Sequence, residues 1–160
     1  MEPLPNFIAQ HPLANGLSPA QLSLLVECAT CLNFEAGQMI FSEGESAQNC
    51  FVIQSGKIAL ELNLGEERAQ IDVVGAGGAL GWAWMFPPFY WHFDARALEP
   101  TRVVSFYGKR LREECERDHV LGYKLANYMT ELVINRLQKT RLQLLQIPKT
   151  PKSFSVIAPN

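Results

Sequence analysis

The sequence lacks the features that mark several common classes of protein. It has no apolar run of the roughly 18–20 residues that a membrane span needs, and its first residues form no signal segment. We therefore expect a cytoplasmic protein without a membrane partner. Basic charge is not in excess either, because 14 Lys and Arg stand against 16 Asp and Glu, for a net charge of −2. A domain that grips nucleic acid is usually basic, so the overall charge gives DNA binding no support.

Residues that could carry out catalysis or hold a metal are few and scattered. The three histidines, His11, His92 and His119, lie far apart in the sequence. No Ser-His-Asp arrangement, phosphate-binding loop or pair of carboxylates in a known motif is recognisable. The sequence thus predicts no enzyme, no metal site and no cofactor.

Four cysteines are present, but their spacing matches neither a disulfide framework nor an iron–sulfur motif. Cys28 and Cys31 form a CxxC pair, which would suit a redox pair or half of a metal site. No second CxxC pair and no nearby histidine accompany them. We interpret both as small apolar residues at the point where a helix passes into the first strand.

What the sequence does contain is the composition of one globular domain, with 160 residues, 48% hydrophobic and 19% charged. A helix is expected to begin after Ser18, because Pro19 suits the first helical position and Gln21 completes a capping box.

Between Leu32 and about Phe106 the pattern changes to short strands separated by glycine-containing turns. Ser55-Gly56 is typical of a hairpin turn between two of these strands. Many short strands at this spacing indicate a sandwich or jelly roll. The expected strands are residues 32–35, 38–41, 50–54, 57–64, 68–74, 93–98 and 102–107.

Helical spacing returns in residues 109–117 and in a second helix that Asp118 caps and that ends near Gln146, before Pro148. About 28 residues would span roughly 42 Å, more than a domain of this size needs for its own core. We therefore predict a homodimer through this helix, although its apolar stripe is interrupted at Asn135, Arg136 and Lys139. The alternative is a helix that lies wholly along its own barrel. The residues assigned to the dimer helix are Leu125, Met129, Leu132, Val133 and Leu137.

Glycine spacing links these elements to a known family. The segments on which this link rests are residues 34–38, 40–45 and above all 51–58, followed by Gly75 and Leu80-Gly81, and by residues 95–98. Over about residues 10–145 the chain resembles the cyclic-nucleotide-binding domain of the bacterial catabolite-activator and anaerobic-regulator family. That resemblance implies a mainly β fold, an eight-stranded jelly roll (double-stranded β-helix) with an N-terminal helix and a long C-terminal helix.

The resemblance also implies domain boundaries. Residues 1–147 would form the domain, with the jelly roll at about 32–107 and the C-terminal helices at about 109–147. Residues 148–160, which contain three prolines, would form a flexible tail.

The family's ligand lies in a phosphate-binding cassette, in which a glutamate accepts from the ribose hydroxyl and an arginine pairs with the cyclic phosphate. In this sequence Trp82 occupies the glutamate position, and Trp91 or its neighbour falls at the arginine position. Arg96 matches a later family arginine on the outgoing strand. A charge-assisted bond of about 1.5–3 kcal/mol is lost with the arginine. Ordinary binding of cAMP or cGMP is therefore not expected.

Seven aromatic residues lie between Trp82 and Phe93. One interpretation is a remodelled pocket for a flatter or more apolar effector; the other is that the rings simply fill the cavity. The candidate pocket residues are Gly81, Trp82, Ala83, Trp84, Met85, Trp91, His92 and Phe93.

These observations predict a regulatory or sensor module with a small-molecule effector. One alternative is a ligand-free module for dimerisation or protein interaction. Another is the sensory part of a transcription regulator whose DNA-binding part lies elsewhere. No recognition helix fits in the residues after Ile147, so we expect no direct contact with nucleic acid.

Overall fold

The computed structural model describes residues 2–147. Three short helices open the chain: α1 (Leu4–Gln10), a 3₁₀ turn η1 (Pro12–Ala14) and α2 (Pro19–Glu27). The predicted capping box begins α2, since the Ser18 hydroxyl accepts from the Gln21 N–H at 3.2 Å and the Gln21 side chain accepts from the Ser18 N–H at 2.9 Å. Helix α1 was not predicted, because Pro3 precedes it and Pro5 lies in its first turn, where proline is nevertheless tolerated. The predicted tail lies outside the described residues.

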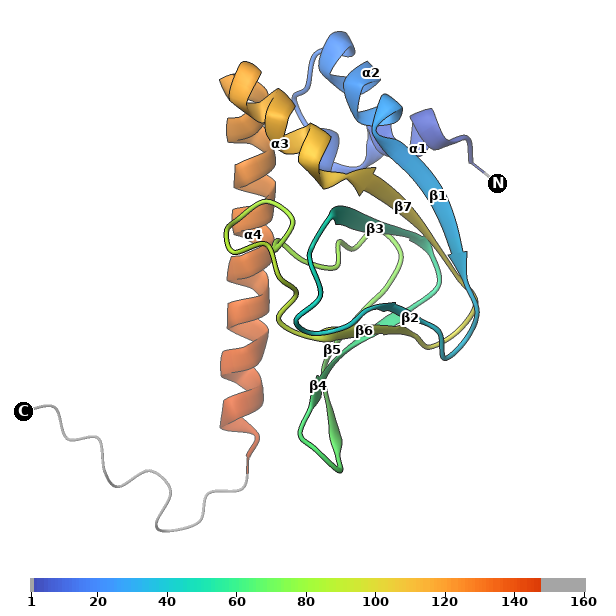
Figure 1. The fold of residues 1–160 in the computed structure, drawn as a ribbon, viewed down its shortest axis with the longest axis vertical. Coiled ribbons are helices and arrows are strands. Elements are labelled where there is room, and N and C mark those ends of the chain that lie inside the picture. Colours follow the sequence, from blue (N-terminus) through green and yellow to red (C-terminus); the bar gives the residue numbers. More distant parts are fainter. Residues whose placement is uncertain (1, 148–160) are drawn as a thin grey trace, which may run out of the picture.

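The described part of the chain holds seven strands in two antiparallel sheets, of order β1-β7-β3 and β2-β6-β4-β5 (Figure 1). Each predicted strand is present, which confirms the mainly β jelly roll with flanking helices. The described residues contain no eighth strand, and two isolated bridges, Ser46–Tyr90 and Val52–Ala79, lie outside the named strand pairings. The strands are β1 (Ala29–Phe34), β2 (Met39–Phe41), β3 (Asn49–Ser55), β4 (Ile58–Asn63), β5 (Arg68–Val74), β6 (Asp94–Ala97) and β7 (Thr101–Tyr107).

The turn at Ser55-Gly56 does not close the predicted hairpin. Strand β3 pairs with β7 and strand β4 pairs with β5 and β6, so this turn carries the chain from one sheet to the other. Gly56 has a φ of +98°, and a Cβ there would lie 2.7 Å from the Thr101 Cα. Glycine is therefore required by both conformation and space, which explains a turn signal that looks like a hairpin in the sequence.

Two clusters of buried side chains hold the elements together. One lies between the helices and the three-stranded sheet and includes Leu25, Cys50 and Phe106; the other lies between the two sheets and includes Ile58 and Leu60. Cys28 directly follows α2 and the next residue begins β1, as interpreted from the sequence. The thiols of all four cysteines are free.

Two helices follow the roll: α3 (Gly108–Arg117) and α4 (His119–Leu145). The Asp118 side chain caps α4 by accepting from the N–H groups of Val120 and Leu121 at 3.1 and 3.2 Å. Helix α4 stands beside the roll and runs along its whole height (Figure 1). No helix in residues 2–147 combines the length and the apolar character needed to cross a membrane.

The structure corrects part of the predicted dimer helix. Leu125 and Met129 are fully buried in the protomer's own core, where no partner can reach them. Leu132 and Val133 are half-buried, whereas Leu137 is 54% exposed. The apolar positions chosen from the sequence therefore mix two faces of one helix.

Candidate effector site

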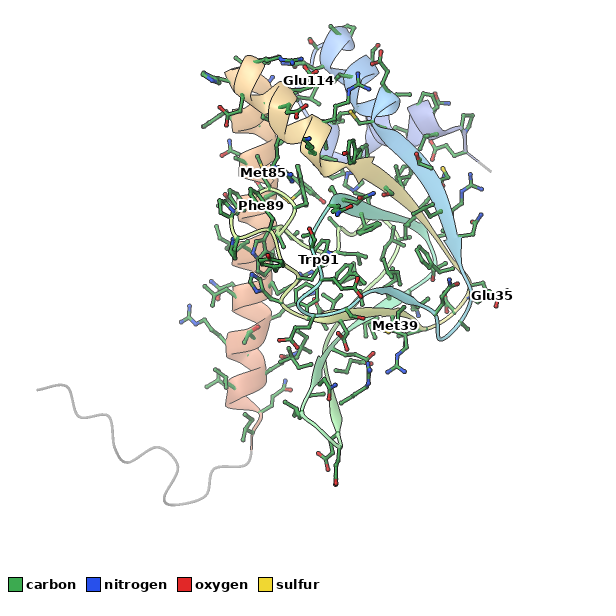
Figure 2. The ribbon with its side chains drawn as sticks, viewed as in Figure 1. Glu35, Met39, Met85, Phe89, Trp91 and Glu114 are labelled. Atoms are coloured by element: carbon green, nitrogen blue, oxygen red, sulfur yellow. The ribbon has the colours of Figure 1, made fainter. Side chains whose placement is uncertain are left out.

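The chain between β5 and β6 contains the predicted cassette, and its central feature is a buried tryptophan. Trp91 lies inside the roll and is only 3% exposed (Figure 2). Its ring stacks on that of Phe41, with centroids 3.8 Å apart and planes at 7°. Phe93 packs beside both rings. Such a set of rings buries a large apolar area between the sheets.

Gly81 shows how closely the rings approach the backbone of the cassette. A Cβ at this position would lie 2.9 Å from the Trp91 ring and 3.3 Å from that of Phe93. The space at this turn is thus occupied by apolar ring atoms. Trp91 is uncharged and nearly buried, and together with Phe41 and Phe51 it lines an open cavity of about 440 Å³.

The other candidate pocket residues are divided between two places. Ala83 and Trp84 are buried, and Met85 packs against the core between the helices and the three-stranded sheet. The Trp84 indole N–H makes no hydrogen bond within the described structure. His92 is exposed, with its ring centroid 6.4 Å from that of half-buried Trp82. The predicted set is therefore mostly packed interior and does not line one common cavity.

Arg96 also lies away from the cassette interior. Its guanidinium donates twice to the Glu61 carboxylate, at 2.8 and 2.5 Å. A second arginine, Arg68, pairs with Asp94 at 3.1 Å. Glu61 and Asp94 are buried beneath these arginines, so the four charges form a closed network on β4, β5 and β6.

An open cavity of about 540 Å³ lies instead between α4 and the segment 72–79 at the end of β5. We call it the α4 groove. This groove was not predicted from the sequence, where its signal was the set of polar residues that interrupt the apolar stripe of α4. Its walls include Asp72, Val74, Ala79, Tyr128, Leu132, Arg136 and Lys139.

Arg136 connects the groove to the cassette. Its side chain is 12% exposed, and one terminal N–H donates to the carbonyl of Leu80 at 3.0 Å. The guanidinium carbon lies 5.6 Å from the ring centroid of Trp82 and 5.3 Å from that of Phe93, within cation–π range. The Nε atom lies 3.8 Å from the Asp72 carboxylate and makes no hydrogen bond to any residue in the described range 2–147. Burial lowers the pKa of Arg136, and the nearby Asp72 charge partly opposes this.

His11 supports the other side of the groove. Its Nε2 donates to the Gly77 carbonyl at 2.7 Å, while its Nδ1 accepts from the Leu13 N–H at 3.0 Å. The ring lies edge-on to Tyr128 of α4, with centroids 5.7 Å apart. Burial lowers the pKa of His11 and raises that of Tyr128 to about 12. Both rings are therefore uncharged near neutral pH and act as fixed packing elements.

A two-sheet roll with a glycine-turned cassette and a long helix against it defines a class of regulatory domain. A family model described as "Cyclic nucleotide-binding domain" matches residues 31–118, more than half of the chain. The chain belongs to the cyclic nucleotide-binding domain family.

Known relatives agree with this assignment. The "Cyclic AMP receptor protein" of Thermus thermophilus is 24% identical over 134 residues, and the match covers 83% of this chain but 60% of that protein. A putative cyclic nucleotide-binding protein from Geobacter metallireducens superposes with a TM-score of 0.77 at 27% identity, covering 85% of this chain and 99% of the other. A cyclic nucleotide-binding domain from Methylobacillus flagellatus has a TM-score of 0.76 at 17% identity, covering 91% and 82% respectively. The last of these shows the fold alone. The chain thus spans less than two thirds of the length of its curated relative.

Proposed function

We propose that this protein is a regulatory domain whose interior does not bind cAMP or cGMP in the family's usual way, and which transmits its state through α4. The observation that carries this proposal is the buried Trp91–Phe41 stack. A cyclic phosphate in this space would have to displace both rings. It would then lack the cation that the family places there.

The energetic argument has two parts. Opening the site exposes a large aromatic surface, which costs free energy in proportion to its area. The phosphate then loses a charge-assisted hydrogen bond worth about 1.5–3 kcal/mol. Each 1.4 kcal/mol is about a factor of ten in affinity, so loss of the cation alone weakens binding roughly ten- to a hundredfold, and opening the ring cluster weakens it further.

The test is titration of the protein with cAMP and with cGMP by calorimetry and by tryptophan fluorescence. Neither nucleotide should produce a saturable signal below about 1 mM, a dissociation constant that corresponds to only about 4 kcal/mol. Trp91→Arg and Trp91→Leu form a matched pair, because both remove the ring but only arginine supplies a cation. Micromolar binding by the unmodified protein would overturn the proposal.

The same proposal includes a homodimer formed by the outward face of α4. Residues on that face recur at alternating spacings of three and four, the period of a coiled-coil seam, and all of them are exposed. A second copy of the same helix would bury the apolar side chains of this seam, which water otherwise contacts. The seam residues are Val120, Tyr123, Asn127, Thr130, Ile134, Leu137, Arg141 and Leu144.

Sedimentation equilibrium tests the dimer directly. We expect a reversible dimer at micromolar concentrations, and a monomer at all concentrations up to the millimolar range would contradict it. This result is independent of the nucleotide titration, so each half of the proposal can fail alone.

A further inference from the structure

We propose that the α4 groove binds a small organic anion with a planar apolar body, of the aromatic carboxylate class. This inference rests on the proposed function, because it gives the domain an effector site outside the filled interior. It concerns a cavity that is separate from the ring cluster around Trp91.

Charge gives the first argument. Helix α4 presents two cations to the groove, Arg136 and Lys139, one turn apart. They face the single carboxylate of Asp72, which lies 3.4 Å from the Lys139 Nζ and 3.8 Å from the Arg136 Nε. Neither distance is that of a strong charge-assisted hydrogen bond, which lies at roughly 2.7–2.9 Å. The groove therefore has an excess of positive charge.

The second argument is an unused donor. The Nε–H of Arg136 is buried and makes no hydrogen bond to the described residues. A buried donor without a partner costs about as much as a lost hydrogen bond, and such an atom beside a cavity marks a place for an acceptor. A carboxylate in the groove can accept from this N–H and from Lys139 together. Asp72 is held on β5, and its carboxylate stays beyond strong hydrogen-bond distance of both the Arg136 Nε and the Lys139 Nζ.

The shape and lining of the groove indicate the rest of the ligand. Val74 and Ala79 are buried at its base, and Leu132 and Tyr128 form its helical wall. A Cβ added at Gly75 would meet no atom within 4 Å, so this edge of the groove is open. A volume of about 540 Å³ falls in the range of roughly 300–1,000 Å³ that small-molecule sites occupy. The Tyr128 ring and these apolar side chains offer a surface suited to a planar apolar ligand.

Binding at this place would reach the rest of the molecule through Arg136. That side chain also donates to the Leu80 carbonyl, next to Gly81 of the cassette. An anion that draws the guanidinium toward the groove weakens this contact between α4 and the roll. The ligand thus has a differential effect on the position of α4, which is what a regulatory effector requires.

The experiment compares benzoate with benzamide, which has the same ring and shape but no charge. Each is titrated into the full chain labelled with ¹⁵N, and amide shifts are followed at Gly75, Asn135 and their neighbours. Benzoate should give saturable shifts there with a dissociation constant of about 1 mM or lower. Benzamide should bind at least roughly tenfold more weakly, because it cannot form the charge-assisted bonds.

Two substitutions with opposite expected signs test the charges. Lys139→Gln should weaken benzoate binding roughly threefold to tenfold, since it removes one cation from an exposed position. Asp72→Asn should strengthen binding by a similar factor, because the competing carboxylate is removed. Lys57→Gln is the matched control; it removes an exposed positive charge outside the groove and should change nothing.

Equal binding of benzoate and benzamide, or an effect of Lys57→Gln equal to that of Lys139→Gln, would overturn the anion site. Absence of saturable benzoate shifts at the groove would do the same. None of these results would touch the proposed function, which fails only on micromolar binding of a cyclic nucleotide or on a strict monomer. The two proposals are therefore tested separately.

Discussion

The two faces of α4 carry the same kinds of apolar side chain, but one face is buried and the other is exposed. Leu121, Leu125 and Met129 are fully buried against the protomer's own helices and sheet. On the other face, Leu137 and Leu144 are each 54% exposed. One helix of 27 residues thus has two apolar stripes, one buried within the protomer and one exposed.

The comparison shows what helical periodicity can and cannot reveal. Spacings of three and four identify a stripe, but a helix about seven turns long has room for more than one. Only packing decides which stripe faces the core. Substitutions on the two faces should therefore differ widely in their effect on the stability of the single protomer.

The largest loss is expected for Leu125→Ala, on the inward face. The side chain is fully buried, so its removal should lower the free energy of unfolding by about 2–5 kcal/mol. Urea denaturation at low protein concentration measures this. Leu144→Ala, on the outward face, is the control and should stay within about 0.5 kcal/mol. Similar losses for the two would erase the distinction between the faces.

A smaller loss is expected for Arg136→Met, which keeps an unbranched apolar stem but is shorter and removes the donors. The carbonyl of fully buried Leu80 then lacks its hydrogen-bond partner, at a cost of about 1–3 kcal/mol. The same unfolding measurement applies, with Lys139→Met as a control on an exposed neighbour. If Arg136→Met leaves stability unchanged, Arg136 does not anchor α4.

The pH dependence of stability should report on His11, which packs against Tyr128 on the inward side of α4. Burial lowers the pKa of His11 in the folded protein, so the unfolded chain binds the proton more readily. The contribution of His11 to the free energy of unfolding is therefore complete above about pH 6.5. It is lost as the pH drops from there through the pKa of the folded state. His11→Gln, compared by chemical denaturation across this range, should flatten the slope. An unchanged slope would show that His11 is not its source.

The smallest effect on the protomer, but a large one on assembly, is expected for Leu137→Asp. Position 137 is exposed in the protomer, so the thermal midpoint of the monomer should barely change. In a dimer the substitution places two carboxylates in an apolar seam, which should raise the dissociation constant at least roughly a hundredfold. Sedimentation equilibrium measures the shift, and Arg136 and Lys139 are left intact. An unaltered dissociation constant would move the interface elsewhere.

Much of the fold could be predicted because local signals agreed with the global structure. Strand β5 was expected at 68–74 and is found there, and Ser18 and Asp118 cap their helices as expected. The pairing of β3 could not be predicted. A Ser-Gly turn looks the same whether the chain returns to its own sheet or crosses to the next one.

The site was harder to predict than the fold. The sequence shows tryptophans in the cassette, but whether Trp91 lines a pocket or fills it depends on contacts with Phe41, which lies fifty residues earlier. The α4 groove was missed because Asp72 and Arg136 are brought together only by the docking of α4. In the sequence, charged residues such as Arg136 are visible only as interruptions of an apolar stripe, because the surface that faces them is not known.

The docking of α4 has a consequence for how the protein can change by mutation. Two of its contacts with the roll end on main-chain oxygens, from Arg136 to the Leu80 carbonyl and from Gln143 to the Ile71 carbonyl at 2.9 Å. A carbonyl is present whatever residue occupies positions 71 and 80. Substitutions there leave these acceptors in place, whereas a single codon change at 136 or 143 removes a contact. These two contacts are thus encoded in the helix, and their strength can evolve without altering the sheet.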